Sequence, residues 1–180
     1  MSQKFTEGFV CSNLSDNFEG LSFKKIPISS VEENSVKVSI KAASLNFPDL
    51  LMTQGKYQNK PTLPFALGME GAGIVSEVGS QSCTFKEGDE VMFGSWGHGA
   101  IAKEIVLPES MLSQKPKSFS FEEAAAFKTV YLTAFVGLIR RGNLVEGENL
   151  LVHGATGGVG MAAVEPVSYT HLRAHETRVH

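Results

Sequence analysis

The sequence predicts a mixed α/β protein, in which a β-rich unit is followed by the opening of a doubly wound sheet. Two observations predict this order. Residues 1–117 contain short alternating segments separated by turns, whereas residues 118–165 follow the pattern helix, strand, glycine-rich turn and helix. With 180 residues, of which 42% are apolar and 19% charged, the chain is long and apolar enough to bury a core.

Strands are predicted in the first unit wherever apolar residues alternate with polar ones. The first thirty residues are mixed and indicate short strands and turns. A clear strand with one buried face follows, because polar or small neighbours separate Val36, Val38, Ile40 and Ala42. Pro48 suits the first turn of a helix and Gly55 can end a helix, so a short helix is predicted between them.

Glycines and turns shape the rest of the β-rich unit. Residues 68–79 have the pattern of a glycine-studded strand, and glycines in strands mark bulges, barrel corners or a close backbone approach. A turn leads into a further strand at residues 88–93, and residues 100–107 are predicted to form another. Short strands separated by turns favour a small, strongly bent barrel.

A helical region begins at Ser120, because Ser120 and Glu123 have the spacing of a capping box. Small and apolar residues continue the helical pattern for several turns. Two arginines followed by Gly142 then provide a typical helix end. An interruption between two helices is expected at Thr129 or Thr133.

The glycine-rich turn after residues 150–152 is the motif most directly linked to chemistry. Ala155, Gly157 and Gly160 have the spacing A-x-G-x-x-G of a dinucleotide-binding turn, and the preceding apolar run is typical of a parallel strand buried on both faces. Gly160 would let the helix lie close to the strand, whereas Ala155 demands an ordinary negative φ. The first N–H groups of the helix suit a pyrophosphate. A flexible turn without a ligand would look similar.

Composition and charge exclude several function classes. The formal net charge is −3 without a block of like charges, so neither a nucleic acid nor a membrane surface is expected as a partner. The N-terminus lacks a basic region followed by an apolar one, so secretion is not expected either. Cys11 and Cys83 are isolated, which excludes a disulfide framework and a four-cysteine metal site. These features predict a cytoplasmic protein.

In this order, the motifs resemble the medium-chain dehydrogenase/reductase superfamily, and within it the zinc-independent quinone oxidoreductase (zeta-crystallin-like) branch. The resemblance runs from about Val36 to Glu165. The matching segments are residues 43–49, 55–57, Pro64 with 68–75, 88–91, 132–135 and 151–160.

The resemblance implies both domains and chemistry. A GroES-like catalytic or substrate domain is expected over residues 1–117, followed by a truncated Rossmann nucleotide-binding domain over residues 118–165. The implied cofactor is NADPH, with NADH not excluded, and the implied substrate is a quinone or a related conjugated carbonyl. The full-length form is expected to be a homodimer.

The resemblance also implies that no zinc is used. Zinc-dependent relatives have cysteine where Asn46 stands here and histidine where Met69 stands. A neutral amide and a thioether are poor replacements for the thiolate and imidazole that zinc prefers. Hydrogen-bond donors would then stabilise the oxyanion that develops as hydride leaves the nicotinamide.

The resemblance implies three catalytic candidates, Asn46, Tyr57 and Thr133. The implied cofactor contacts are Tyr57, Thr133, Ala155, Thr156, Gly157, Gly158, Val159 and Gly160. Each catalytic candidate also has a structural interpretation. The asparagine can bond loop backbone near Pro48, the tyrosine can be an amphipathic rim residue, and the threonine can bond its own preceding turn.

Four further polar residues are interpreted as structural. Asp49 and Glu70 are predicted to bond backbone N–H groups or a basic partner rather than to act as general acids. His98 and His153 are predicted to be histidines with satisfied hydrogen bonds.

Residues 166–180 depart from the resemblance. Pro166 is expected to break the helix that follows the glycine-rich turn. The pair His171 and His175 has helical spacing for a metal, but a solvated tail is the preferred interpretation. This segment resembles translated adapter or linker sequence, so it is expected to be non-native and to take no part in the fold. The 180-residue product is predicted to be aggregation-prone and at most weakly active, because a lone strand and helix leave apolar faces exposed.

Three functions are consistent with these residues. The first is the reduction of quinones or conjugated carbonyls described above. The second is an enoyl or enone reductase of the same superfamily. The sequence does not indicate the size of the substrate pocket, so it does not distinguish this function from the first. The third is a non-catalytic binding or structural role on the same fold.

Overall fold

The computed structural model describes residues 4–81, 84–95, 99–169 and 173–177. The chain forms two compact units, Met1–Ala126 and Phe127–His180. Three predictions fall outside the described residues, those for Cys83, His98 and His171. Within the described ranges, no helix is both long and apolar enough to cross a membrane.

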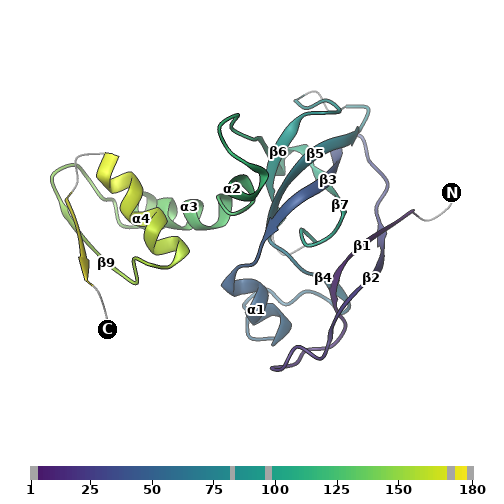
Figure 1. The fold of residues 1–180 in the computed structure, drawn as a ribbon, viewed down its shortest axis with the longest axis horizontal. Helices are drawn as coiled ribbons and strands as arrows, with labels where there is room; N and C mark the ends of the chain where they lie inside the picture. The colour runs from purple at the N-terminus through teal and green to yellow at the C-terminus, as the bar shows by residue number, and fades with distance from the viewer. Residues whose placement is uncertain (1–3, 82–83, 96–98, 170–172, 178–180) are drawn as a thin grey trace. The chain divides into compact units, whose positions relative to one another are not determined.

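A five-stranded antiparallel sheet forms most of the first unit (Figure 1), with strand order β7-β3-β5-β6-β8. The strands are β3 Ser35–Ser44, β5 Glu70–Val78, β6 Glu90–Gly94, β7 Glu104–Pro108 and β8 Leu112–Gln114, with a 3-10 turn η1 at Glu109–Met111. Val36 and Val38 of β3 are fully buried, which confirms the predicted one-sided strand. The register of β3 against β5 shifts at two bulges, and such bulges bend a sheet.

A glycine lets the two central strands approach closely. A Cβ on Gly73 in β5 would lie 2.2 Å from the carbonyl oxygen of Ser39 in β3. No side chain fits that space, so the predicted close backbone approach is confirmed. The core of the unit lies against this sheet and contains Val36, Val38, Val75, Phe85, Val91, Phe93, Ala100, Ile105, Leu107 and Leu112.

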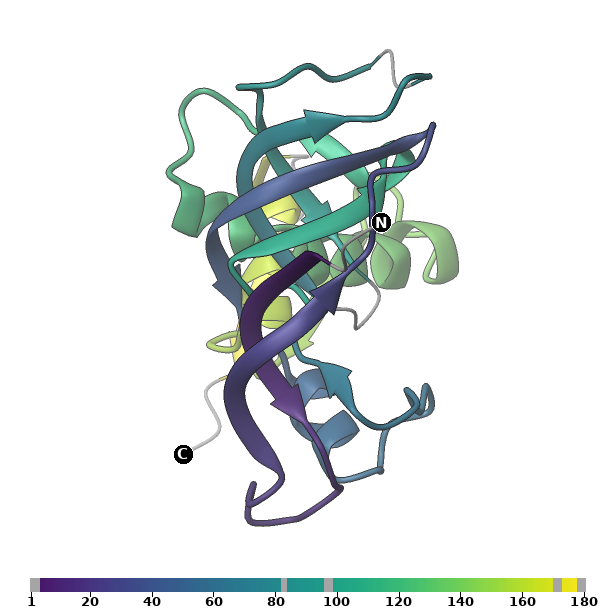
Figure 2. The same cartoon turned by 90° about the vertical axis from the view of Figure 1, so that its right-hand side faces the viewer.

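A second sheet has the strand order β2-β1-β4. Its strands are β1 Lys4–Cys11, β2 Leu21–Ile28 and β4 Phe65–Ala66. Strands β1 and β2 pair as an antiparallel hairpin over their whole length, and Figure 2 shows them running side by side. The predicted strands and turns of the first thirty residues are therefore confirmed.

The strand predicted at residues 100–107 starts later than expected, at Glu104. The residues before it bond to β1 instead of extending β7. The Phe9 N–H donates to the Ile101 carbonyl at 2.9 Å, and the Lys103 N–H donates to the Glu7 carbonyl at 2.8 Å. Because these backbone groups are satisfied by the other sheet, the segment links the two sheets.

Helix α1, Phe47–Thr53, follows directly from the end of β3 (Figure 1). Pro48 occupies the first helical turn, and Gly55 has a φ of 68° just beyond the helix end. Proline has its φ preset for the first turn, and glycine adopts a positive φ without strain. The helix therefore begins and ends as predicted.

Helix α2, Phe121–Ala125, begins with the predicted capping box. The Glu123 N–H donates to Ser120 Oγ at 3.1 Å, and the Ser120 N–H donates to Glu123 Oε2 at 2.7 Å. The helix ends at Ala125, so the predicted interruption at Thr129 or Thr133 is wrong. The break falls between the two compact units, because the buried alanines of α2 face strands β3 and β5 of the first unit.

The second unit contains two helices that contact each other and a short parallel sheet. Its elements are α3 Lys128–Phe135, a π-helical turn η2 Val136–Arg141, β9 Asn149–His153, α4 Gly158–Tyr169 and β10 Arg173–Thr177. Gly142 ends η2, as predicted. Val152 is buried with alanines of α3 and α4, but Leu151 is 53% exposed, so β9 is not buried on both faces as expected. Among the described strands β9 pairs only with β10, which leaves part of it uncovered.

Residues after Glu165 differ from expectation in two ways. Helix α4 continues through Pro166 to Tyr169, and β10 pairs in parallel with β9. A proline removes one helical hydrogen bond, and the helix continues beyond that single lost bond. A helix that joins two parallel strands is the usual crossover, which gives β10 a place beside β9. A non-native origin of residues 166–180 stays a prediction.

Candidate functional site

The first candidate region lies where β3 ends and β5 begins. Ser44 is the last residue of β3 and pairs with Glu70, the first residue of β5. Asn46 follows two residues later, directly before α1. The antiparallel register therefore places a hydroxyl, an amide and a carboxylate together, although they are far apart in the sequence. These three residues and Asp49 are called the Asn46 cluster below.

The side chain of Asn46 donates to both neighbours. Its Nδ2 lies 2.9 Å from Glu70 Oε1 and 3.1 Å from Ser44 Oγ. The Ser44 hydroxyl also donates to Glu70 Oε1, at 2.6 Å. Glu70 is 1% exposed, so these charge-assisted bonds lie in a region of low dielectric and hold the amide firmly.

The distances among Asn46 Nδ2, Ser44 Oγ and Glu70 Oε1 indicate that one hydrogen of the Asn46 side-chain amide is left over. The two acceptors subtend an angle of about 50° at Nδ2, whereas the two N–H bonds of a planar amide point roughly 120° apart. One shared N–H therefore serves both acceptors. The second N–H points away from both, and no described residue accepts it. Because Asn46 is partly exposed, this donor is available to a ligand.

Asp49 holds the backbone of the same asparagine. Its Oδ2 accepts the Asn46 N–H at 2.8 Å, which confirms the predicted structural carboxylate. The side chain is 1% exposed, and its Oδ1 has no hydrogen-bond partner of ordinary geometry among the described residues. Burial raises the pKa of Asp49 above its ordinary value of 3.8 and the charge of Glu70 raises it further, although the Asn46 and Gly68 N–H groups act in the opposite direction.

The raised pKa of Asp49 predicts a pH-dependent stability. The folded chain binds this proton more tightly than the unfolded chain, so the contribution is fully present below pH 3.8 and is lost as the pH rises through the folded-state pKa. The wild type should therefore lose stability relative to Asp49→Asn as the pH rises from the unfolded-state pKa to the folded-state pKa of Asp49. The difference between their free energies of unfolding should fall by about 1.4 kcal/mol for each pH unit between these two pKa values. Urea unfolding at a series of pH values measures this difference, and parallel profiles for the two proteins would contradict it.

Tyr57 lies beyond the other end of α1. It is partly buried against an apolar cluster that contains Cys11, Met52, Phe65 and Leu67, with Met69 and Ile101 also packed against it. Its hydroxyl makes no hydrogen bond to any described residue, so the hydroxyl remains available to a ligand. Asn46 thus lies directly before α1 and Tyr57 lies shortly after its end.

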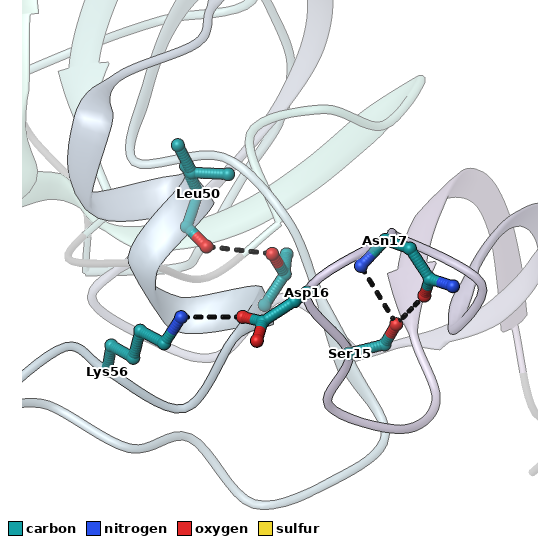
Figure 3. Close-up of polar contacts among 6 residues, drawn as sticks. Ser15, Asp16, Asn17, Leu50 and Lys56 are labelled. Carbon is teal, nitrogen blue, oxygen red and sulfur yellow. Dashed lines mark hydrogen bonds and ion pairs between the residues drawn. The ribbon is translucent and has the colours of Figure 1, made fainter.

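The segment before Tyr57 is tied to the loop between β1 and β2 (Figure 3). Figure 3 shows Lys56 Nζ, which lies 2.6 Å from Asp16 Oδ1. In addition, the Ser15 N–H donates to the Thr53 carbonyl at 3.0 Å. The ion pair is exposed and contributes little by itself. The backbone hydrogen bond nevertheless limits how far the end of α1, and the tyrosine after it, can move.

The residues of this region do not fit a zinc site. The Asn46 nitrogen is a hydrogen-bond donor to Glu70 and Ser44, and an amide nitrogen that donates has no lone pair for a metal. Met69 packs against the apolar cluster and offers only a thioether. Within the described ranges, no group of three or more His, Cys, Asp or Glu side chains could hold a metal.

The second candidate region is the glycine-rich turn between β9 and α4. Gly154 has a φ of 71°, whereas Ala155 has a negative φ, as predicted. The Gly157 N–H closes the turn on the Gly154 carbonyl at 3.0 Å. A Cβ on Gly160 would lie 2.3 Å from that same carbonyl oxygen, so only glycine fits. The close contact that Gly160 permits is with this turn, rather than with the body of the strand.

This turn fits the phosphates of a dinucleotide. Gly158, Val159 and Gly160 open α4, so their N–H groups precede the first helical hydrogen bonds and stay available to an anion. Thr156 and Val159 are exposed, and glycine at 157 leaves the approach open. The backbone therefore forms the kind of cradle that the sequence motif predicts.

Thr133 lies in the same unit as the turn. Its Oγ1 donates to the Thr129 carbonyl at 2.6 Å, which is the structural bond considered from the sequence. The hydroxyl oxygen is exposed and can still accept a hydrogen bond. Val130, one turn earlier on α3, contacts α4 at Gly158, where a Cβ would lie 2.9 Å from Val130 Cγ1. A role for Thr133 in cofactor binding stays a prediction.

Sequence reasoning missed parts of the Asn46 cluster. No role is predicted for Ser44, and the side-chain hydrogen bonds from Ser44 and Asn46 to Glu70 are not predicted either. The only signal was the position of both residues at predicted strand ends. His153 was expected to be a satisfied histidine, but it is exposed and makes no side-chain hydrogen bond to a described residue.

Comparison with known proteins identifies related chains. Residues 32–117 match the family model of the alcohol dehydrogenase GroES-like domain. The chain is 42% identical over 132 residues to the quinone oxidoreductase-like protein 2 homolog of Nematostella vectensis, which covers 73% of this chain and 36% of that protein. The chain thus spans about a third of this curated relative.

Solved structures show the same similarity. The human synaptic vesicle membrane protein VAT-1 homolog-like protein superposes with a TM-score of 0.90 and 31% identity, over 98% of this chain and 57% of that one. The quinone oxidoreductase of Pseudomonas syringae superposes with a TM-score of 0.85 and 34% identity, over 95% of this chain and 52% of that one. In both, the match extends over the two units described above.

Proposed function

Because the chain belongs to the medium-chain dehydrogenase/reductase superfamily and is similar to its quinone oxidoreductase-like members, we propose that the complete protein reduces quinones or related conjugated carbonyls with NADPH and without zinc. The first unit contains the GroES-like domain, and the second contains the start of a Rossmann sheet. An oxidoreductase of this superfamily binds a nicotinamide cofactor, which supplies the hydride when bound.

The available N–H of Asn46 is the observation that carries this proposal. At a position where zinc-dependent relatives place a metal ligand, this chain holds an amide whose second hydrogen has no described acceptor. A fixed donor aimed at a carbonyl oxygen stabilises negative charge on that oxygen as hydride arrives at carbon. Asn46 can therefore supply part of the polarisation that a zinc ion supplies elsewhere.

Other residues of the chain are proposed to bind and orient the cofactor and the substrate. The N–H groups that open α4 hold the pyrophosphate, and the tight turn at Gly154 and Gly160 fixes their direction. The hydroxyl of Tyr57, which bonds no described residue, is assigned to the nicotinamide or the substrate. The proton that completes reduction comes from water, because no described residue of the Asn46 cluster is a free acid facing solvent.

Turnover of the complete protein tests the proposal. NADPH oxidation is followed with a series of quinones and, separately, with conjugated enones, before and after treatment with a zinc chelator. We expect quinone-dependent oxidation that the chelator does not change. Activity with enones alone would instead favour the enoyl or enone reductase. Retained stability without NADPH affinity would favour a non-catalytic role, and inertness toward both substrate classes would contradict the proposal.

The proposal extends to assembly and place in the cell. From the resemblance we propose a homodimer that acts on small molecules, and the moderate charge and isolated cysteines of the sequence support a place in the cytoplasm. NADH can replace NADPH within this proposal, and comparing the two dissociation constants on the complete protein distinguishes them.

A further inference from the structure

We propose that Glu70 is a positioning residue, whose carboxylate orients the Asn46 amide so that an N–H, and not Oδ1, faces the substrate carbonyl. This inference rests on the proposed function and deepens it. The two ends of an asparagine amide have nearly the same shape, so packing alone does not decide which of them points outward. An oxygen pointing outward would repel the carbonyl oxygen that the nitrogen attracts.

Glu70 can set this direction because an ionised carboxylate only accepts hydrogen bonds. Its Oε1 lies 2.9 Å from Asn46 Nδ2, so the amide must turn its nitrogen toward Glu70. Glu70 is 1% exposed, and water therefore cannot easily take the place of this bond. A turn of the amide by 180° would bring two acceptor oxygens together in a buried setting, which is strongly unfavourable.

Ser44 cannot perform the same task alone, because a hydroxyl both donates and accepts. In the structure its proton goes to Glu70 Oε1, at 2.6 Å, which leaves an oxygen lone pair for the Asn46 amide at 3.1 Å. The carboxylate thus fixes the direction of both bonds. Without it, the hydroxyl could equally donate to Asn46 Oδ1, and both amide orientations would be satisfied.

The rest of the geometry holds the asparagine in place. Asp49 Oδ2 accepts the Asn46 N–H, so the backbone is fixed independently of the side chain. Strand pairing of Ser44 with Glu70 fixes the distance between the two acceptors. The orientation of the amide remains to be set, and Glu70 sets it from the nitrogen side, while the capping box of α1 places the Asp49 backbone N–H near the same side chain.

Steady-state kinetics of the complete protein give the first test, with variants Glu70→Ala and Glu70→Gln. Alanine removes the acceptor, whereas glutamine keeps an acceptor oxygen but adds a donor, so neither variant forces the Asn46 nitrogen to face residue 70. We expect kcat to fall about 10- to 100-fold in Glu70→Ala, the scale of a misplaced catalytic group, with KM and NADPH affinity changed much less. Glu70→Gln should also lose kcat, although less than Glu70→Ala, because one of its two amide orientations still accepts from Asn46. Unchanged kcat in Glu70→Ala, or wild-type kcat in Glu70→Gln, would overturn the proposal.

Two further variants keep this test decisive. Glu70→Leu removes the acceptor but fills the space, and it replaces Glu70→Ala if that variant does not fold. Glu77→Gln is the matched control, because Glu77 lies on the same strand but forms a partly exposed ion pair with Lys37. We expect the control to keep wild-type kinetics.

The side-chain amide of Asn46 gives a readout that needs no turnover. In the 180-residue chain labelled with ¹⁵N-asparagine, one Asn46 amide proton should be moved downfield by its bond to the carboxylate. The downfield signal should disappear in Glu70→Ala and persist in Ser44→Ala. An unchanged signal in Glu70→Ala would refute the orienting role. If the wild type reduces neither quinones nor enones, the proposed function fails while this measurement still decides how the amide is held.

Discussion

Replacing Gly160 with alanine is expected to raise the NADPH dissociation constant of the complete protein at least about tenfold, which corresponds to about 1.4 kcal/mol. The reason is steric. The new Cβ would lie 2.3 Å from the Gly154 carbonyl oxygen and 2.7 Å from the Ala155 Cα. Both contacts are with backbone, so the turn itself must move, and with it the N–H groups that open α4. Fluorescence titration with NADPH measures the change.

Alanine substitutions at two other glycines provide a comparison for the effect expected at Gly160. Gly154 has a φ of 71° but open space around it, so Gly154→Ala introduces backbone strain without a clash and should raise the NADPH dissociation constant less than Gly160→Ala does. Gly137, in the π-helical turn, has neither a positive φ nor a close neighbour, and Gly137→Ala should bind NADPH like the wild type. The order of effects is thus Gly160, Gly154, Gly137. Equal affinities for all three variants would show that the turn does not hold the cofactor.

Local chemistry explains which features the sequence could predict. The capping box at Ser120, the helix between Pro48 and Gly55 and the glycine-rich turn all depend on residues within a few positions of each other. Their geometry is determined by backbone sterics and hydrogen bonds that the local sequence already contains. The one-sided strand at Val36 also follows from its own alternation.

Features that depend on distant partners were harder to predict. The break between α2 and α3 lies where the chain passes from one unit to the other, and no local signal marks it. Leu151 is exposed because burial of a parallel strand requires covering elements on both faces. The Asn46 cluster requires the register of β3 against β5, which sets Ser44 opposite Glu70. The sequence therefore predicts Asn46 as a candidate but not the carboxylate that holds it.

Replacing Asn46 with alanine is expected to lower kcat by about 10²–10³, or about 2.7–4 kcal/mol, the effect of removing one oxyanion-stabilising donor. Because such a donor acts mainly in the transition state, kcat and kcat/KM should fall together while NADPH affinity is kept. The fold should survive, since Asp49 bonds the backbone N–H of residue 46, which alanine retains. Asn34→Ala, at an exposed turn before β3, is the matched control and should keep wild-type kinetics.

The variant Asn46→Asp distinguishes the hydrogen-bond donor of the Asn46 amide from the volume of its side chain. Aspartate has nearly the same size as asparagine, but when ionised it has no hydrogen to donate, and it would place a second negative charge beside the buried Glu70. Its kcat should be no higher than that of Asn46→Ala, and its free energy of unfolding should be lower. If the aspartate variant instead kept wild-type kcat, the amide would matter only for its volume. Neither the oxyanion role of Asn46 nor the orienting role of Glu70 could then be correct.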